Sequence, residues 1–341
     1  MRIKSGGGGG EHNYTISFIR LIAMVLVIIC HIMQHEQSPL ANWFNVGVQI
    51  FLCISGYLYG LAPKRSTIEF YHDRFLKILI PFYIAYLSFA LVEYVFFREV
   101  FDVLRFLCGL FCRAFISGAG HLWYVSLILL CYILTPLLQL YRDRYIKDKK
   151  SWALLFCCCI LVVSISFGLY NSFFSPAWLC CYVIGFFLGA NKDYFRSRTL
   201  LVLFGILALL SNGVQIYIDY FTTFKFKGYM ETAYKFFSDY SHTMLGVFLF
   251  LLIKITVDRI HWAKMKNLKK VLDLTDKYSY ECYLVHQFVI LGPCSLMAIT
   301  KILPLNILLI VLVILLLTVT LKCIEMFVMK NVMKYNGRSQ V

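Results

Sequence analysis

The sequence predicts an all-α, polytopic integral membrane protein with about ten transmembrane helices. Of its 341 residues, 60% are hydrophobic and only 15% are charged, which is more apolar surface than a soluble domain of this length could bury. The apolar residues gather into runs of about 20, the length at which a helix crosses a bilayer. Basic residues concentrate in alternate connections between these runs. Together, these three observations predict that the chain lies in a lipid bilayer.

Ten apolar runs predict the spanning helices. In chain order they lie near residues 17–34, 43–60, 77–97, 121–141, 152–170, 176–190, 199–219, 240–257, 279–299 and 304–329. The polar start of the chain leads into the first run without a small-residue cleavage site, so we expect this run to stay as an anchor. An even number of spans places both termini on the same side.

The basic residues assign a side to the termini. With the N-terminus inside, the cytoplasmic segments hold 23 of the 33 Lys and Arg residues, the opposite side holds 7, and 3 lie within spans. Short cytoplasmic loops retain positive charge, so this bias predicts cytoplasmic termini in a multi-pass protein of the inner or plasma membrane. The net charge of +15 then reflects topology and contact with anionic lipid headgroups, and predicts no nucleic acid partner.

One membrane domain is predicted at 16–330, between tails at 1–15 and 331–341. The glycine tract at 5–10 is typical of a flexible tether. Most of the 13 cysteines lie in apolar spans without metal-ligand spacing, so they are expected to be buried thiols. Phosphate-loop and dinucleotide glycine patterns are missing from the sequence. We therefore expect no bound metal or cofactor.

The first span contains two ionisable residues, and their presence calls for an explanation because placing such side chains in the hydrocarbon core costs free energy. Arg20 and His31 are eleven residues apart, which brings them within roughly 20° of one helical direction and about 16 Å apart along the axis. Arg20 could alternatively extend its guanidinium back to the headgroups. A neutral His31 could accept a proton near pH 7, whereas an interfacial histidine bonded to a backbone carbonyl is the alternative.

Two further segments combine small or basic residues with an apolar span. Ser55 and Gly56 interrupt the second span, and close packing between helices is their favoured role, with a contact that could hold the first span in place. Arg74 and Lys77 are three residues apart at the cytoplasmic entrance of the third span, so they share a helical face. They could bind the phosphates of a cytosolic donor or lipid headgroups.

The remaining candidates lie in the fourth, ninth and tenth spans. His121, Trp123 and Tyr124 open the fourth span at the outer interface, where an aromatic belt by itself explains the Trp and the Tyr. Lys322 and Glu325, three residues apart, are expected to neutralise each other. Depth along the spans predicts an outer layer and an inner layer. The outer layer holds His31 and His121, and the inner layer holds Arg20, Arg74, Lys77, Glu281 and His286.

Five motifs in this order resemble the acyltransferase family 3 membrane proteins, whose members transfer acyl groups, commonly acetyl, onto sugars or other acceptors. The motifs are Arg20 to His31 with ten residues between, the segment 51–58 with its Ser55-Gly56, the segment 74–81, the segment 121–124 and the segment 280–286. Each motif is weak alone, and the resemblance spans most of the chain.

The resemblance implies roles for these residues. Arg20 and His31 would be the essential catalytic pair, and acetyl-CoA would be the acyl-donor substrate. Arg74, Lys77 and His286 would bind the donor, and the acceptor side would hold His121, Trp123 and Tyr124. Lys77 stands where the family often has arginine, which keeps the charge but loses the planar bidentate fork. His31 would act as a general base or would transiently carry the acetyl group.

The expected reaction is O-acetylation of a cell-envelope or exported carbohydrate, or of another hydroxyl acceptor. The partners are then acyl-CoA, the acceptor, membrane lipid, and either a second copy of the chain or an envelope-biosynthesis protein. A transporter or channel is the alternative, in which the same intramembrane ions would form a solute or proton pathway. A membrane scaffold for an envelope polysaccharide system is a third interpretation.

Overall fold

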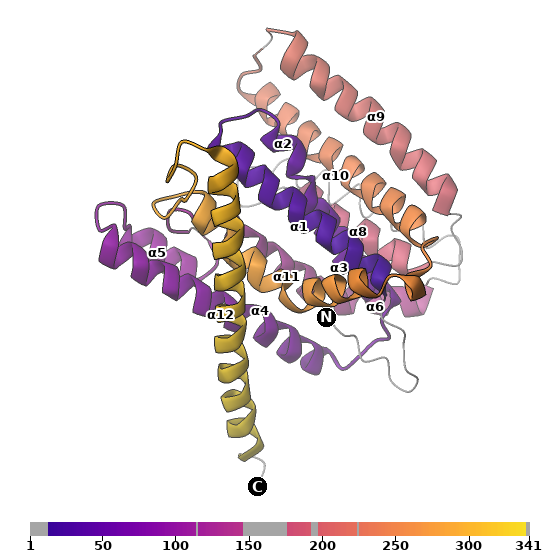
Figure 1. Ribbon diagram of the computed structural model, residues 1–341. Helices are drawn as coiled ribbons and strands as arrows, with labels where there is room; N and C mark the ends of the chain where they lie inside the picture. The colour runs from indigo at the N-terminus through magenta and orange to yellow at the C-terminus, as the bar shows by residue number, and fades with distance from the viewer. Residues whose placement is uncertain (1–12, 114, 146–175, 192–196, 224, 339–341) are drawn as a thin grey trace. The chain divides into compact units, whose positions relative to one another are not determined.

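The computed structural model describes residues 13–113, 115–145, 176–191, 197–223 and 225–338, and secondary structure within these ranges is helical (Figure 1). The long helices are α1 (Tyr14–His35), α3 (Val46–Leu61), α4 (Thr67–Phe96), α6 (Trp123–Tyr145), α8 (Pro176–Ala190), α9 (Ser197–Phe221), α10 (Tyr229–Val257), α11 (Lys266–Ile290) and α12 (Leu303–Arg338). Short helices are α2 (Ala41–Phe44), α5 (Val103–Leu110), η1 (Gly120–Leu122) and η2 (Trp262–Lys264).

The helical membrane fold predicted from the sequence is confirmed. Nine of the ten predicted spans coincide with a long helix, and the span predicted near 152–170 lies outside the described residues. Seven helices in the described ranges are long and apolar enough to cross a membrane, and α8 is a shorter apolar helix. The chain is therefore a multi-pass membrane protein.

The predicted edges of the ninth span are wrong. Helix α11 begins at Lys266 instead of near 279, and it ends at Ile290 instead of near 299. Its first turns are rich in lysine, which forms helix well but hides the element from a search for apolar runs. The helix stops because Gly292 has a φ of 85° and Pro293 follows it.

Helices α4 and α10 likewise begin early, at Thr67 and Tyr229 instead of near 77 and 240, and α5 and α12 also differ from the sequence prediction. Helix α5 was not predicted, because eight residues are too few to read as a span; its N-cap Asp102 accepts a hydrogen bond from the backbone N–H of Arg105 at 3.1 Å. Helix α12 continues to Arg338, so most of the predicted C-terminal tail is helical.

The described chain divides into two compact units, each assembled from several segments. Unit 1 comprises 1–27, 42–65 and 133–273, and unit 2 comprises 28–41, 66–132 and 274–341.

Unit 1 is held by close contacts at glycines. A Cβ on Gly56 would collide with the backbone carbonyl of Tyr182 in α8, and a Cβ on Gly185 would collide with the carbonyl of Cys53 in α3. Helices α3 and α8 therefore approach backbone to backbone at Gly56, as close packing of this segment requires. The predicted contact of Gly56 with the first span is wrong. Gly47 supplies that contact, since its Cβ would lie 2.5 Å from the carbonyl of Ala23 in α1.

Unit 2 is held by aromatic stacking and a buried ionic network. Phe89 of α4 stacks on Phe288 of α11 with ring centroids 4.1 Å apart. Lys322 of α12 donates to Glu281 of α11 and to Glu325, each at 2.8 Å, so the predicted neutralisation includes a second carboxylate. These contacts fix the C-terminal half of α11, which carries residues of the site, against α4 and α12.

Candidate active site

Three histidines from distant parts of the sequence meet in unit 2. His31 lies near the end of α1, His121 in η1 and His286 in the last turns of α11. Their ring centroids are 5.0 Å apart for His31 and His286, 4.8 Å for His121 and His286, and 6.2 Å for His31 and His121. All three side chains are buried, and His286 is completely inaccessible. The three form the histidine cluster.

Gln287 links His31 to His121. Its Oε1 accepts a hydrogen bond from the backbone N–H of His121 at 2.7 Å and lies 2.7 Å from His121 Nδ1. A backbone N–H can only donate, so this contact fixes the orientation of the amide. The Nε2 of Gln287 then lies 3.3 Å from Nδ1 of His31. One side chain therefore contacts both histidines.

His31 has a second amide partner on its own helix. Its Nδ1 lies 2.6 Å from Oε1 of Gln34, one turn further along α1. In the tautomer with the ring hydrogen on Nδ1, Nδ1 donates to Gln34 and the Nε2 of Gln287 makes no hydrogen bond to the ring. The Nε2 of His31 then keeps its lone pair, which is the state that a general base or a nucleophile needs.

The tautomer of His286 is set by the backbone. Its Nδ1 lies 2.7 Å from the carbonyl oxygen of Tyr283, which can only accept, so Nδ1 carries the hydrogen. Its Nε2 is buried and has no hydrogen-bond partner among the described residues. A neutral His286 thus offers an unoccupied acceptor atom inside the cluster.

His121 is engaged by the protein on both sides of its ring. Its Nε2 faces the carbonyl oxygens of Tyr283 at 2.9 Å and Leu284 at 3.2 Å, whereas Nδ1 faces Gln287. The hydroxyl of Tyr283 in turn donates to the carbonyl of His121. His121 is therefore placed as a donor that positions Gln287 and α11, because a direct bond from its ring to a substrate would require giving up one of these contacts.

The structure tests the predicted depths. His31 and His121, which were predicted to share the outer layer, are neighbours with ring centroids 6.2 Å apart. The inner position predicted for His286 is wrong, because its ring lies against both of the others. The cause is the early start of α11: counted from Lys266, His286 is close to the end of the helix instead of its first half.

The basic candidates lie on two helices. Arg20 is buried in the first half of α1, in unit 1. Arg74 is buried near the start of α4, in unit 2, with its guanidinium carbon 5.9 Å from the Phe70 ring centroid. Lys77, one turn further, is exposed. Burial of a guanidinium is unusual and indicates a specific role for Arg74.

The aromatic candidates flank the cluster. Tyr124 packs on Tyr283, with ring centroids 5.3 Å apart, and Trp123 packs on Tyr124. Sequence reasoning missed Gln34, Tyr283 and Gln287. Of these three, Gln34 is the one that its spacing from His31 could have identified, since it lies three residues later on the same helix.

The thiol of Cys112, in the segment that leads to His121, is a poorer candidate nucleophile than the histidines. Burial raises the pKa of Cys112 to about 11, so this group stays protonated at neutral pH. The histidines are the better candidates for the chemistry.

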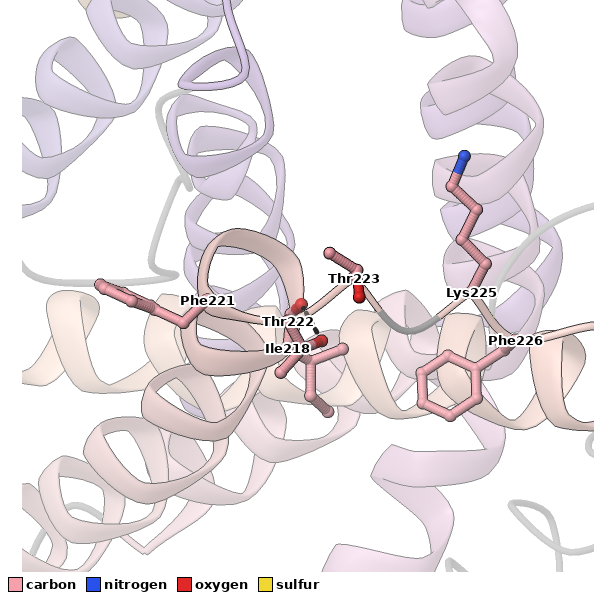
Figure 2. Close-up of a pocket in the computed structure, with 6 residues that line it drawn as sticks. All are labelled: Ile218, Phe221, Thr222, Thr223, Lys225 and Phe226. Atoms are coloured by element: carbon pink, nitrogen blue, oxygen red, sulfur yellow. Dashed lines mark hydrogen bonds between the residues drawn. The ribbon is translucent and has the colours of Figure 1, made fainter.

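An open hollow lies elsewhere, in unit 1, where α9 ends (Figure 2). Within it the hydroxyl of Thr222 donates to the carbonyl of Ile218 at 2.8 Å. Its lining is Ile218, Phe221, Thr222, Thr223, Lys225 and Phe226. Only Lys225 there is ionisable, so the hollow lacks the groups that acyl transfer needs.

Buried bases joined by amide side chains inside a helical membrane protein define a site for acid–base or nucleophilic chemistry. The chain belongs to the acyltransferase 3 family, since the family described as an acyltransferase domain matches residues 13–324. The protein is therefore a membrane acyltransferase. No curated protein and no solved structure matches the chain.

Proposed function

We propose that this protein is an O-acetyltransferase that moves the acetyl group of acetyl-CoA to a hydroxyl of a cell-envelope or exported carbohydrate. The observation that carries the proposal is the histidine cluster, in which three buried imidazoles lie with ring centroids 4.8 to 6.2 Å apart and Nε2 of His286 has no partner among the described residues. Membership of the acyltransferase 3 family supports acyl transfer as the reaction.

In direct transfer, Nε2 of His31 removes the proton of the acceptor hydroxyl as its oxygen attacks the thioester carbon. The new C–O bond forms, the C–S bond breaks, and the protonated His31 returns its proton to the coenzyme A thiolate. In the alternative, Nε2 attacks the thioester carbon, the C–S bond breaks and coenzyme A leaves as the thiolate; the acceptor hydroxyl then attacks the acetyl group, the N–C bond breaks, and the hydroxyl proton passes to the thiolate. Gln34 stabilises both routes, because it accepts from Nδ1 and orients the ring.

The other candidates have separable roles in the proposal. The pantetheine arm of coenzyme A carries amide N–H donors, and Nε2 of His286 is an acceptor available to one of them. Arg74 and Lys77 bind donor phosphates. Arg20 of α1 is the other basic residue assigned to the reaction. Trp123 and Tyr124 face the acceptor, with His121 holding Gln287 in place.

Thiol release from acetyl-CoA tests the proposed function. The purified protein in lipid is supplied with a panel of sugar acceptors, and the products are weighed by mass spectrometry. We expect thiol release that depends on the acceptor. The sugar should gain about 42 Da, the mass of one acetyl group in place of a hydrogen, for each thiol released. Movement of an unmodified solute across the membrane, without thiol release, would show that the protein is a transporter instead.

Neutralising Arg74 is expected to weaken donor binding more than the chemical step. Replacing it with glutamine removes a bidentate phosphate ligand, so the KM for acetyl-CoA should rise by about 10- to 100-fold while kcat falls less. Lys77→Gln should raise the KM by a smaller factor, because an exposed lysine is strongly hydrated. Steady-state kinetics with acetyl-CoA as the varied substrate measure both effects. A fall in kcat at unchanged KM would assign Arg74 to another step.

A further inference from the structure

Unit 1 contains a further group of buried polar side chains. Gln49 of α3, Asn212 of α9 and His242 of α10 are 1%, 7% and 7% exposed. Each has one polar atom without a hydrogen-bond partner among the described residues: Oε1 of Gln49, Oδ1 of Asn212 and Nε2 of His242. With Trp43 of α2, these residues are named the Trp43 cluster.

The members of the Trp43 cluster are neighbours. The ring centroids of Trp43 and His242 lie 5.2 Å apart. Gly246, one turn after His242, has no side chain, and a Cβ there would collide with Cβ of Gln49. Asn212 donates through Nδ2 to the carbonyl of Ser241, the residue before His242, at 2.9 Å. His242 is thereby flanked by residues of α2, α3 and α9.

The unpartnered atoms contrast with the polar residues next to them. Gln215 donates to Ser238 at 2.8 Å and accepts from Ser241 at 2.5 Å, so its amide is satisfied at both ends. A buried polar atom without a partner costs about 1–3 kcal/mol. Three such atoms in one cluster, beside a network that is satisfied, indicate that a bound molecule supplies the missing hydrogen bonds.

The chemistry of the atoms defines that molecule. Asn212 Nδ2 faces two carbonyl oxygens, of Ala208 and Ser241, so its Oδ1 must be an acceptor. His242 Nε2 adds a donor or an acceptor, and Trp43 adds an aromatic face whose Nε1 is held by the Tyr220 hydroxyl at 3.3 Å. Gln49, Asn212 and Trp43 are uncharged. Such a set matches the hydroxyl groups and apolar face of a neutral sugar.

We propose that the Trp43 cluster is a binding subsite for the carbohydrate acceptor, recognising sugar hydroxyls through Gln49, Asn212 and His242. This inference rests on the proposed function for the identity of the sugar as an acceptor. Sugar binding itself can be measured independently of any transfer.

The test is equilibrium binding of methyl glycosides of glucose, galactose, mannose and N-acetylglucosamine to the full chain in lipid nanodiscs, followed by saturation-transfer NMR. The variants His242→Phe and Gln49→Met keep volume but remove an unpartnered atom. We expect saturable binding of at least one glycoside by the wild type, about tenfold or more weaker in each variant. Ser211→Ala, next to Asn212 and bonded only to its own helix at Leu207, is the matched control and should bind normally.

Thermal unfolding separates ligand binding from a structural role. Because the removed atoms have no described partner, the melting temperature should stay constant or rise in both variants. Lower melting temperatures with unchanged glycoside binding would assign the atoms to structural water and overturn the proposal. If His242→Phe fails to fold, Trp43→Phe serves in its place. A wild type that binds none of the glycosides also overturns it.

Thiol release separates this proposal from the proposed function. Glycoside binding that depends on the Trp43 cluster, without acceptor-dependent thiol release, would support the subsite and contradict acetyl transfer. Acceptor-dependent release with an unchanged KM for the sugar in both variants would support transfer and overturn the subsite.

Discussion

Replacing His31 with alanine is expected to lower acetyl transfer by about 10²- to 10⁴-fold, because the variant loses the proposed base at the thioester. The ring is buried, and its Nδ1 lies 2.6 Å from Oε1 of Gln34. The measurement is acceptor-dependent thiol release at saturating acetyl-CoA, where kcat should fall while the KM for the donor changes little.

His35→Ala is the matched control for this variant. His35 lies one turn further along α1 and contacts Glu36 at 3.2 Å at the helix end, where both side chains are partly exposed. It should transfer acetyl groups at the wild-type rate. Normal transfer by folded His31→Ala protein would remove both the base and the acetyl-histidine route from consideration. Rapid quenching with radiolabelled acetyl-CoA and no acceptor distinguishes the routes, because only the second labels His31.

Replacing Lys322 with methionine is expected to destabilise the protein by about 3 kcal/mol, the lower end of the cost of leaving a buried ion unpaired. Lys322 is the shared partner of Glu281 and Glu325, whose side chains are only 3% and 11% exposed. Without the ammonium, two carboxylates face each other in a site with little water. Thermal unfolding in detergent measures the loss, and transfer activity should fall with it because α11 carries His286.

The double variant Glu281→Gln with Lys322→Met is expected to recover part of this stability, since it removes the more buried of the two carboxylates together with their shared partner and leaves only Glu325 charged. The exposed pair Lys235 and Glu231, 2.9 Å apart on one helix face, supplies the control. Lys235→Met should cost less than about 1 kcal/mol. Equal losses for Lys322→Met and Lys235→Met would show that the buried network contributes no more than a surface pair.

Several features of the fold could be predicted from the sequence because they depend on composition along the chain. Apolar runs located α1, α3, α4, α6 and the later membrane helices. The same method misplaced α11, because a helix that begins with several charged turns does not look apolar at its start. The search for apolar runs of spanning length did not find helix α5, because eight residues cannot span a bilayer.

The candidate site was predictable only where one helix carries the information. The spacing of Arg20 and His31 depends on the pitch of α1 alone, and Gln34 lies within a turn of His31. His286 and Gln287 reach His31 across 255 and 256 positions of sequence, so no local periodicity could join them. Contacts of this kind arise from the packing of side chains on different helices.

The sequence by itself determined that this protein is a helical membrane protein, where most of its helices lie, and which family its motifs resemble. These properties follow from hydropathy, helix pitch and short-range spacing. Only the tertiary structure decided that His286 joins His31 and His121, that Gln287 links them, and that Lys322 holds two carboxylates. The physical reason is that hydrogen-bond direction and ring position depend on how helices pack in three dimensions, which one-dimensional spacing does not encode.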